Sequence, residues 1–319
     1  AAEKDYPVLL QQARRTVDEL PDVPAEPGPL RYKGDLDTHQ RYVAYSHNQE
    51  SFKFMLDPML ASGLEKISAM GYGNAINALS DQEGGVAKYF SQRFAQVTNP
   101  SLDSIREADG MTLRVALGAH PNSGAEDAPQ IVVPSPILTH SDMLKIRTQE
   151  STPVQRFPMV YTPIAGDAEA NAAALSTAVD AVCDEVEAFA REQGGIAVVT
   201  DRHVSTDKAA LPLIVLVSAV NQRLIEEGLR LRVSVIVESG QISSSHHVAA
   251  TLGFGASAVY PLAVRLRAEE KFAADPDAAF AKFAKAAEKS LMKTMGRVGL
   301  CTAESYIGGE FFEPNYLDT

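Results

Sequence analysis

The sequence contains little cysteine: only Cys183 and Cys301 occur among its 319 residues. Two cysteines so far apart provide no disulfide framework, and they fit a protein of the reducing cytoplasm. They are also too few for an iron–sulfur cluster held by this chain alone, because such clusters take about three or four cysteine ligands. We therefore predict a cytoplasmic protein that folds without disulfides, with both cysteines in structural positions.

Positive charge is also scarce. Lys and Arg number 29 against 41 Asp and Glu, so the formal net charge is -12. Nucleic acids and anionic membranes attract basic surfaces, so an excess of acidic residues argues against both as partners. No apolar run approaches the roughly 18 residues that a membrane-spanning helix requires. The sequence thus predicts neither a nucleic-acid partner nor a membrane partner.

The remaining composition is that of an ordinary globular protein, with 45% hydrophobic and 22% charged residues. A chain of this length buries enough apolar surface to fold without a metal ion. Residues 1–29 are interpreted as a helix, over residues 1–20, followed by a proline-rich linker. Residues 30–319 then form the main domain, with a helical and irregular part at 30–125 and a βα part at 126–319.

Two helices are expected within the helical and irregular part. Asn48 can cap the first, whose apolar face includes Phe52 and Met59 and which ends at Gly63. The second is expected over residues 89–97, just before a proline that would interrupt it.

From residue 130 onwards, short apolar runs alternate with helical segments. Strands are expected at 131–133, 157–161, 196–200, 233–237 and 256–260, and helices at 168–192, 211–227, 244–252 and 276–295. Near-continuous apolar strands joined by helices indicate a parallel sheet covered on both faces. The spacing fits right-handed βαβ units, so we predict an α/β domain.

Candidate functional residues follow two of these strands, because functional groups in parallel α/β folds collect at the carboxyl ends of strands. Asp201 and Arg202 follow the strand at 196–200, and Glu238 follows the strand at 233–237. Asp201 and Arg202 can bind a charged substrate. A structural ion pair or a loop cap is the simpler explanation.

Two adjacent histidines, His246 and His247, open the helix expected at 244–252. Adjacent residues lie about 100° apart around a helix, so these histidines do not naturally share one metal ion. No G-x-S-x-G nucleophile motif accompanies the serines before them. The simpler interpretation is that a serine caps the helix and the histidines bond to nearby backbone. Gly253-Phe254-Gly255 precedes a strand rather than opening a helix, which indicates a tight turn and not a dinucleotide loop.

Several short motifs occur in a fixed order along residues 45–313. They include FAQVTNP at 94–100, PSPIL at 134–138, TDR at 200–202, VESG at 237–240, the histidine pair at 246–247, LGFGA at 252–256 and KSLMKTM at 289–295. This ordered series resembles the central domain of glutamate synthase large subunits, the domain between the amidotransferase and synthase domains. The resemblance is specific, because many separate motifs agree in both sequence and spacing.

The resemblance implies an irregular, reduced (β/α) barrel-like domain with parallel strands, preceded by a mainly helical N-terminal region. It also implies a place in glutamate biosynthesis and ammonia assimilation. In this family an amidotransferase domain releases ammonia from glutamine. A synthase domain then adds the ammonia to 2-oxoglutarate and reduces the product at FMN, near a 3Fe-4S cluster. The central domain scaffolds these two partner domains and lines the ammonia tunnel.

The family's catalytic groups lie in the flanking domains, so the resemblance implies no complete catalytic site, no cofactor and no metal in this segment of an oxidoreductase. FMN and the 3Fe-4S cluster are expected in the adjoining synthase domain. The residues that the resemblance leaves as candidates for a tunnel wall, a domain interface or a vestigial site are Asp201, Arg202, Glu238, His246, His247, Gln96, Thr98 and Asn99.

One departure from the family concerns residues 69–74, which read AMGYGN where the family usually has SMGDDTP. The paired aspartates of that segment are absent, and a Gly-rich anion cradle is a weaker interpretation of the same stretch. Two alternatives stay open. The chain can be an independent flavin- or phosphate-binding (βα) enzyme that uses the strand-end residues, or the central subunit of a related amidotransferase such as N-methylglutamate synthase.

Overall fold

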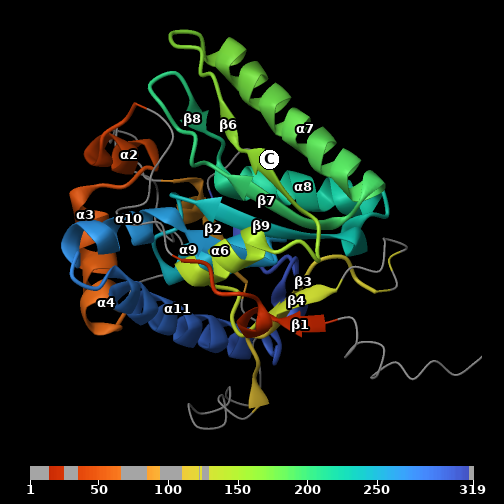
Figure 1. Ribbon diagram of the computed structural model, residues 1–319. Coiled ribbons are helices and arrows are strands. Elements are labelled where there is room, and N and C mark those ends of the chain that lie inside the picture. Colours follow the sequence, from red (N-terminus) through yellow and green to blue (C-terminus); the bar gives the residue numbers. More distant parts are fainter. Residues whose placement is uncertain are drawn as a thin grey trace, which may run out of the picture.

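The computed structural model describes residues 14–24, 35–65, 85–93, 110–121, 123 and 129–315. Four parallel strands form its central sheet, with helices packed along it (Figure 1). In spatial order the strands are β10 (Ala258–Pro261), β9 (Val233–Ser239), β7 (Gly195–Thr200) and β5 (Val154–Pro158). The helices that follow them in the chain are α10 (Leu262–Lys271), α9 (Ser245–Gly253), α8 (Leu213–Glu226) and α7 (Ala168–Glu192). The predicted parallel α/β sheet is confirmed.

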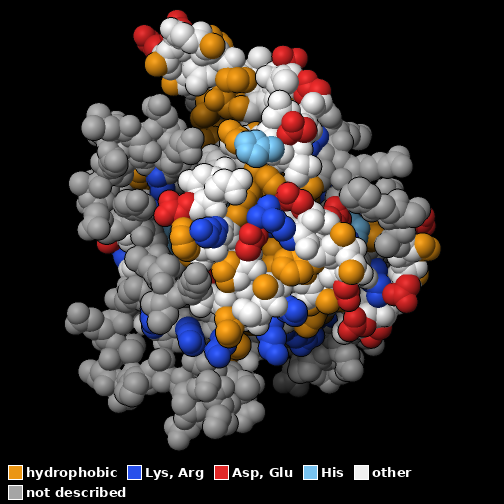
Figure 2. Space-filling view, turned by 90° about the vertical axis from the view of Figure 1, so that its left-hand side faces the viewer, with side chains coloured by type: hydrophobic (Ala, Val, Ile, Leu, Met, Phe, Trp, Pro, Cys, Tyr) orange, Lys and Arg blue, Asp and Glu red, His pale blue; other side chains and the backbone are white. Residues whose placement is uncertain are grey.

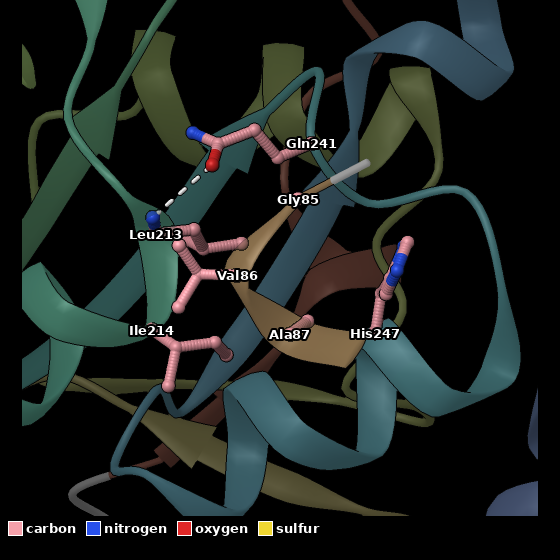
Figure 3. A pocket seen from close by; sticks show the side chains of 7 residues that line it. All are labelled: Gly85, Val86, Ala87, Leu213, Ile214, Gln241 and His247. Carbon is pink, nitrogen blue, oxygen red and sulfur yellow. Dashed lines mark hydrogen bonds between the residues drawn. The ribbon is translucent and has the colours of Figure 1, made fainter. Parts of the chain in front are cut away.

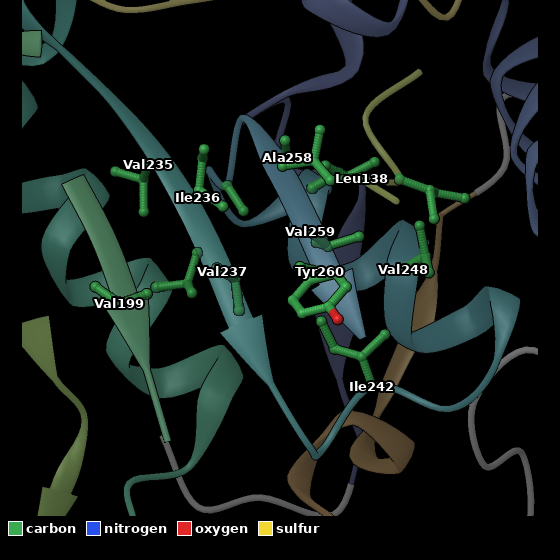
Figure 4. Close-up of a cluster of buried hydrophobic side chains, with 14 of the residues drawn as sticks. Leu138, Val199, Val235, Ile236, Val237, Ile242, Val248, Ala258, Val259 and Tyr260 are labelled. Atoms are coloured by element: carbon green, nitrogen blue, oxygen red, sulfur yellow. The ribbon is translucent and has the colours of Figure 1, made fainter. Parts of the chain in front are cut away.

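The strands are apolar because the sheet is covered on both faces. Every residue of β7 and β9 is buried. On one face, Phe157 of β5 contacts Phe189 of α7, with ring centroids 5.9 Å apart. On the other face, Tyr260 of β10 contacts Phe280 of α11 (Pro276–Val298), with 6.1 Å between the centroids. Figure 4 shows side chains of β7, β9 and β10 that meet in this core.

The sheet continues beyond β10 through a parallel bridge between Ile137 and Val259. The helix α6 (His140–Thr148) follows this bridge, just as α7 to α10 follow their strands. This succession is that of an irregular, reduced (β/α) barrel, because a closed barrel needs more strands than the described residues supply.

The helices of the βα part agree well with the predicted ranges. The helix expected at 168–192 is confirmed at both ends, and Asp167 caps it by accepting a hydrogen bond from the backbone N–H of Ala170. α11 extends to Val298 and ends at Gly299, which has a left-handed φ of 82°. α8 begins at Leu213 rather than at residue 211, directly after a proline.

The helices α6 and α10 were not expected from the sequence. Thr139 caps α6 by accepting from the Asp142 backbone N–H, and the Asp142 carboxylate accepts from the Thr139 backbone N–H, so a capping-box pattern was present in the chain. α10 has no clear apolar stripe because it is buried almost all around, including Arg265 and Arg267. A periodicity argument therefore cannot find α10.

The predicted helix after Asn48 is confirmed as a continuous helical run in three pieces. They are α3 (Gln49–Ser51), a π-helical turn (Phe52–Leu56) and α4 (Asp57–Ser62). The Asn48 side chain accepts a hydrogen bond from the backbone N–H of Ser51 at 2.8 Å, and Gly63 ends the run with a φ of 68°. A preceding helix, α2 (Thr38–Ala44), completes the described helical region.

Two expected helices are wrong where the structure describes them. Residues 14–20 form strand β1 (Arg14–Thr16) and a 3-10 turn, because β1 pairs with β4 (Gln130–Val133) and this ladder outweighs the apolar spacing. The segment expected as a helix at 89–97 forms strand β2 (Phe90–Gln92), paired antiparallel with β11 (Phe312–Pro314). Residues 1–13 and 94–97 lie outside the described residues.

Two smaller pairings complete the described strands. β3 (Val115–Leu117) pairs antiparallel with β4, and β6 (Val160–Tyr161) pairs antiparallel with β8 (Ala209–Ala210). The predicted boundary between residues 29 and 30 falls outside the described residues and stays a prediction. None of the described helices combines the length and the apolar character that crossing a membrane would require.

Candidate functional site

Asp201 follows β7 and is completely buried. Its carboxylate accepts hydrogen bonds from Ser239 Oγ at 2.6 Å, from the Gly240 backbone N–H at 2.9 Å and from Gln241 Nε2 at 3.3 Å. Ser239 ends β9, and the other two donors lie in the loop that follows it. Burial raises the pKa of Asp201 to about 6, although these hydrogen bonds favour the charged form. Asp201 therefore joins the ends of two neighbouring strands and has no accessible face for a substrate.

Glu238, at the end of β9, is also fully buried and lies between two arginines. Arg202 pairs with its Oε1 through two nitrogens, and Arg156 Nη2 donates to its Oε2 at 2.8 Å. Burial alone would raise the pKa of this carboxyl, but the two guanidinium groups outweigh burial and hold the pKa below its usual value. The two strand-end residues Arg202 and Glu238 thus neutralise each other inside the protein.

The carboxyl edge of the sheet is covered by the segment that follows α2. The Tyr45 hydroxyl donates to the backbone oxygen of Asp201 at 3.2 Å, and His47 Nε2 lies 2.7 Å from the backbone oxygen of Gly240. Tyr45 is 1% exposed and His47 6%, and burial lowers the pKa of His47 to about 4, so its ring is neutral. In barrel enzymes this edge holds the ligand. Here two side chains of the same chain, Tyr45 and His47, occupy part of this edge.

Substituting Gly240 tests how closely Tyr45 covers this edge. A Cβ at Gly240 would lie 2.3 Å from ring atoms of Tyr45, so the ring must move. We expect Gly240→Ala to lower the free energy of unfolding by about 1–3 kcal/mol, measured by urea denaturation. Gly85→Ala is the control, because a Cβ there meets nothing within 4 Å. In a Tyr45→Leu background the Gly240 substitution should cost much less, and an unchanged cost would contradict the close contact.

The raised pKa of Asp201 has a consequence for the pH dependence of stability. Its folded pKa of about 6 exceeds the ordinary value of about 3.9, so the stabilisation by its proton is fully present below about pH 4 and is lost as pH rises through 6. Relative to Asp201→Asn, the wild-type free energy of unfolding should increase by on the order of 2–3 kcal/mol from pH 7 to pH 4. Comparing the two proteins cancels the contribution of the buried histidines to the pH dependence, because both proteins contain them. The control is Asp180→Asn at an exposed position, for which no such change is expected. A difference in free energy of unfolding between wild type and Asp201→Asn that did not vary with pH would contradict the prediction.

The histidine pair on α9 lies apart from the Asp201 and Glu238 groups and bonds to nearby polar atoms. Ser244 caps α9 by accepting from the His247 backbone N–H at 3.2 Å, as the simpler interpretation predicted. His246 Nε2 lies 2.8 Å from the backbone oxygen of Ala87, and His247 Nδ1 accepts from the Ser243 backbone N–H at 3.2 Å. Burial lowers the pKa of His246, and it lowers the pKa of His247 to about 3, so both rings are neutral.

A small cavity lies beside His247, where the turn at Val86–Tyr89 crosses the starts of α8 and α9 (Figure 3). Its volume is about 10 Å³, enough for roughly one water molecule. Its lining consists of Gly85, Val86, Ala87, Leu213, Ile214, Gln241 and His247. Gln241 connects this cavity to Asp201, because its Nε2 donates to that carboxylate and its Oε1 accepts from the Leu213 backbone N–H at 3.1 Å.

The other sequence candidates have separate outcomes. Gln96, Thr98 and Asn99, together with the Gly-rich stretch at 69–74, lie outside the described residues. Within the described ranges, no cluster of three or more His, Cys, Asp or Glu side chains could hold a metal ion. Cys183 is buried, which raises its pKa to about 11, whereas Cys301 is exposed, and a structural role for Cys301 stays a prediction.

Three residues of this edge were missed by sequence reasoning. Arg156 offered one signal, since it is a charged residue inside an otherwise strand-like segment. Tyr45 and His47 offered none, because they reach the sheet edge from more than a hundred residues away along the chain. The expected turn at Gly253-Phe254-Gly255 is confirmed, with a φ of 121° at Gly255.

These observations define the class of protein: a parallel βα domain whose charged strand-end groups bond to one another and whose carboxyl edge is covered by its own N-terminal part. The family model described as "Glutamate synthase central domain" matches residues 40–316, and the chain belongs to that family.

Curated relatives agree with this assignment over most of the chain. The ferredoxin-dependent glutamate synthase of Cyanidium caldarium is 29% identical over an alignment of 295 residues that covers 86% of this chain and 19% of the relative. The NADPH glutamate synthase large chain of Bacillus subtilis (strain 168) is 28% identical over an alignment of 308 residues that covers 93% of this chain and 20% of the relative. The chain thus spans about a fifth of the length of these relatives.

Solved structures show partial similarity. A flavocytochrome b2 variant with sulfite bound has a TM-score of 0.37 at 13% identity, covering 56% of this chain and 40% of that one. Mandelate oxidase with benzoyl-formic acid has a TM-score of 0.33 at 19% identity, covering 44% of each chain.

Proposed function

We propose that this chain is the central, connecting domain of a glutamate synthase large subunit. In this role it holds an amidotransferase domain and an FMN synthase domain at a fixed separation. The observation that carries the proposal is the family match over residues 40–316. The burial of the two strand-end carboxylates supports the proposal. Asp201 and Glu238 are both 0% exposed, and both bond to groups of the same chain.

The proposal assigns the chemistry to the partner domains. Ammonia released from glutamine reaches 2-oxoglutarate through a tunnel whose wall this domain contributes to. A tunnel is useful because free ammonia is mostly protonated at neutral pH and is lost to solvent. FMN and the 3Fe-4S cluster belong to the synthase domain in this scheme. The packing of Tyr45 and His47 over the sheet edge supports a scaffold role over a stand-alone flavin enzyme.

The experiment combines this chain with separately produced amidotransferase and synthase domains of the same enzyme. We expect the chain alone to bind no stoichiometric FMN and to hydrolyse no glutamine. All three parts together should form glutamate from glutamine and 2-oxoglutarate, without releasing free ammonia. Omitting this chain should leave glutamine hydrolysis but release the ammonia.

Two results would contradict the proposal. The first is a yellow preparation of this chain with one FMN per molecule, which would favour the flavin enzyme. The second is N-methylglutamate as the product of the combined parts when methylamine is supplied, which would place the chain in an N-methylglutamate synthase. Mass spectrometry distinguishes N-methylglutamate from glutamate as the product.

A further inference from the structure

The exposed face of α11 carries a row of lysines. Lys282, Lys285, Lys289 and Lys293 follow one another at spacings of three or four residues, so they share one face of the helix. All four are exposed, whereas the opposite face is buried in the core through residues such as Phe283. We call these four residues the lysine ridge. α11 lies at the lower left of Figure 1, and Figure 2 shows Lys and Arg side chains gathered along the lower edge of this side of the molecule.

The lysine ridge is a positively charged segment in an acidic chain, and most of its lysines lack a bonding partner among the described residues. The chain has a formal net charge of -12, yet residues 282–297 contain a single acidic residue, Glu288. Glu288 is half-buried, hydrogen-bonds to Ser135, and flanks the ridge three residues after Lys285. Lys282 Nζ donates to the backbone oxygen of Ala61 at 3.0 Å. Within the described part of the chain, the other three ridge lysines have no hydrogen-bond or ion-pair partner.

This arrangement works against the stability of the helix. Like charges three or four residues apart destabilise a helix by about 0.2–0.5 kcal/mol per pair, and the ridge contains three such successive pairs. The helix dipole favours cations only within the last turn, which begins after Lys293. Local helix energetics therefore do not explain the ridge, whereas a partner of opposite charge would remove the repulsion.

We propose that the lysine ridge is a docking surface for an acidic surface of another protein or protein domain. From Lys282 to Lys293 the ridge is about 17 Å long, which matches one acidic helix or strand. The overall negative charge of the chain repels extended polyanions such as nucleic acid and anionic membrane, but a local ridge still attracts an acidic patch of similar size. Lysines act as mobile point charges, which can orient an approaching acidic partner and speed its encounter with the ridge. This inference is independent of the proposed function.

The test measures binding of a defined acidic probe to the full 319-residue chain. The probe is a fluorescein-labelled helical peptide about 16 residues long, with glutamates every four residues. Fluorescence anisotropy at low salt should show binding that weakens steeply as salt is added. The variant Lys285→Glu/Lys289→Glu/Lys293→Glu should bind at least about tenfold more weakly.

A matched control separates local from overall charge. Lys53→Glu/Lys208→Glu/Lys271→Glu changes the net charge by the same amount at three exposed lysines that are not aligned. This control should bind the probe within about twofold of wild type. Equal weakening in both variants, or no weakening in either, would overturn the proposal. Ridge-dependent self-association in sedimentation, or ridge-dependent binding to phosphatidylserine vesicles, would also overturn it, in favour of a second copy or a membrane.

The melting temperature tests independently whether the ridge lysines repel one another. Lys289→Glu converts two repulsive pairs into attractive ones, so the melting temperature should rise by about 1–3 °C. A fall in melting temperature would mean that the ridge lysines stabilise the chain itself, and the docking interpretation would be lost.

Discussion

Replacing Glu238 with glutamine is expected to lower the free energy of unfolding by about 3–5 kcal/mol. Glu238 is fully buried, and its two carboxylate oxygens bond to Arg202 and Arg156. Glutamine has a similar shape but no charge. The buried Arg202, whose side chain is only 10% exposed, would then lack its counter-charge. Urea denaturation followed by circular dichroism measures the loss.

The control and a compensating variant make this prediction specific. Glu226→Gln removes an exposed carboxylate at the end of α8 and should leave the denaturation midpoint unchanged. The double variant Glu238→Leu/Arg202→Met removes the buried pair, leaves only the partly exposed Arg156 of the three charges, and should lose less stability than Glu238→Gln alone. If the double variant were the less stable protein, the cost would come from lost packing and not from an uncompensated charge.

Substituting alanine for Gly195 is expected to cost about 3–5 kcal/mol, because two penalties add. Gly195 begins β7 with a φ of 121°, a conformation that residues with a side chain rarely adopt. A Cβ there would also lie 2.4 Å from the backbone oxygen of Pro153, the residue just before the neighbouring strand β5. A backbone atom held in a ladder cannot move aside cheaply, so the pairing of β5 with β7 should suffer.

Gly228 provides the matched control for this substitution. It also has a positive φ, 67°, but nothing lies within 4 Å of its would-be Cβ. Gly228→Ala should therefore cost only the conformational penalty of about 1–2 kcal/mol. The difference between the two variants, measured in the same urea titration, isolates the clash with Pro153. Equal costs would mean that the β5 backbone yields and that the contact is unimportant.

Much of the βα part was predictable because its signals are local. Near-continuous apolar runs mark β7 and β9, and glycines mark the ends of α8 and α11. The helices α6 and α10 were not predicted, for different reasons. The capping pattern at Thr139 was present but overlooked, whereas α10 lacks a polar face because the fold buries nearly all of it. In the N-terminal part, Arg14–Thr16 has helical spacing but forms a strand, since the edge of β4 offers it a ladder.

The candidate site shows the same division between local and distant signals. The strand-end positions of Asp201, Arg202 and Glu238 followed from the parallel pattern, and the structure brings them to one edge of the sheet. His246 and His247 were correctly placed at the start of a helix, with a serine cap. Nothing in the pattern indicated that Arg156 would share Glu238 with Arg202, because that contact spans 82 residues.

The amino-acid sequence by itself determined the order of the βα units and the family to which the chain belongs, because hydrophobic periodicity, turn residues and motif order are properties of the chain alone. Only the tertiary structure decided what the charged strand-end residues do. Tyr45 reaches Asp201 across 156 residues, and His47 reaches Gly240 across 193. Contacts at such separations leave no periodic trace in a single sequence. Whether an edge is open to a ligand or occupied by the protein's own side chains is therefore settled only when the chain is folded.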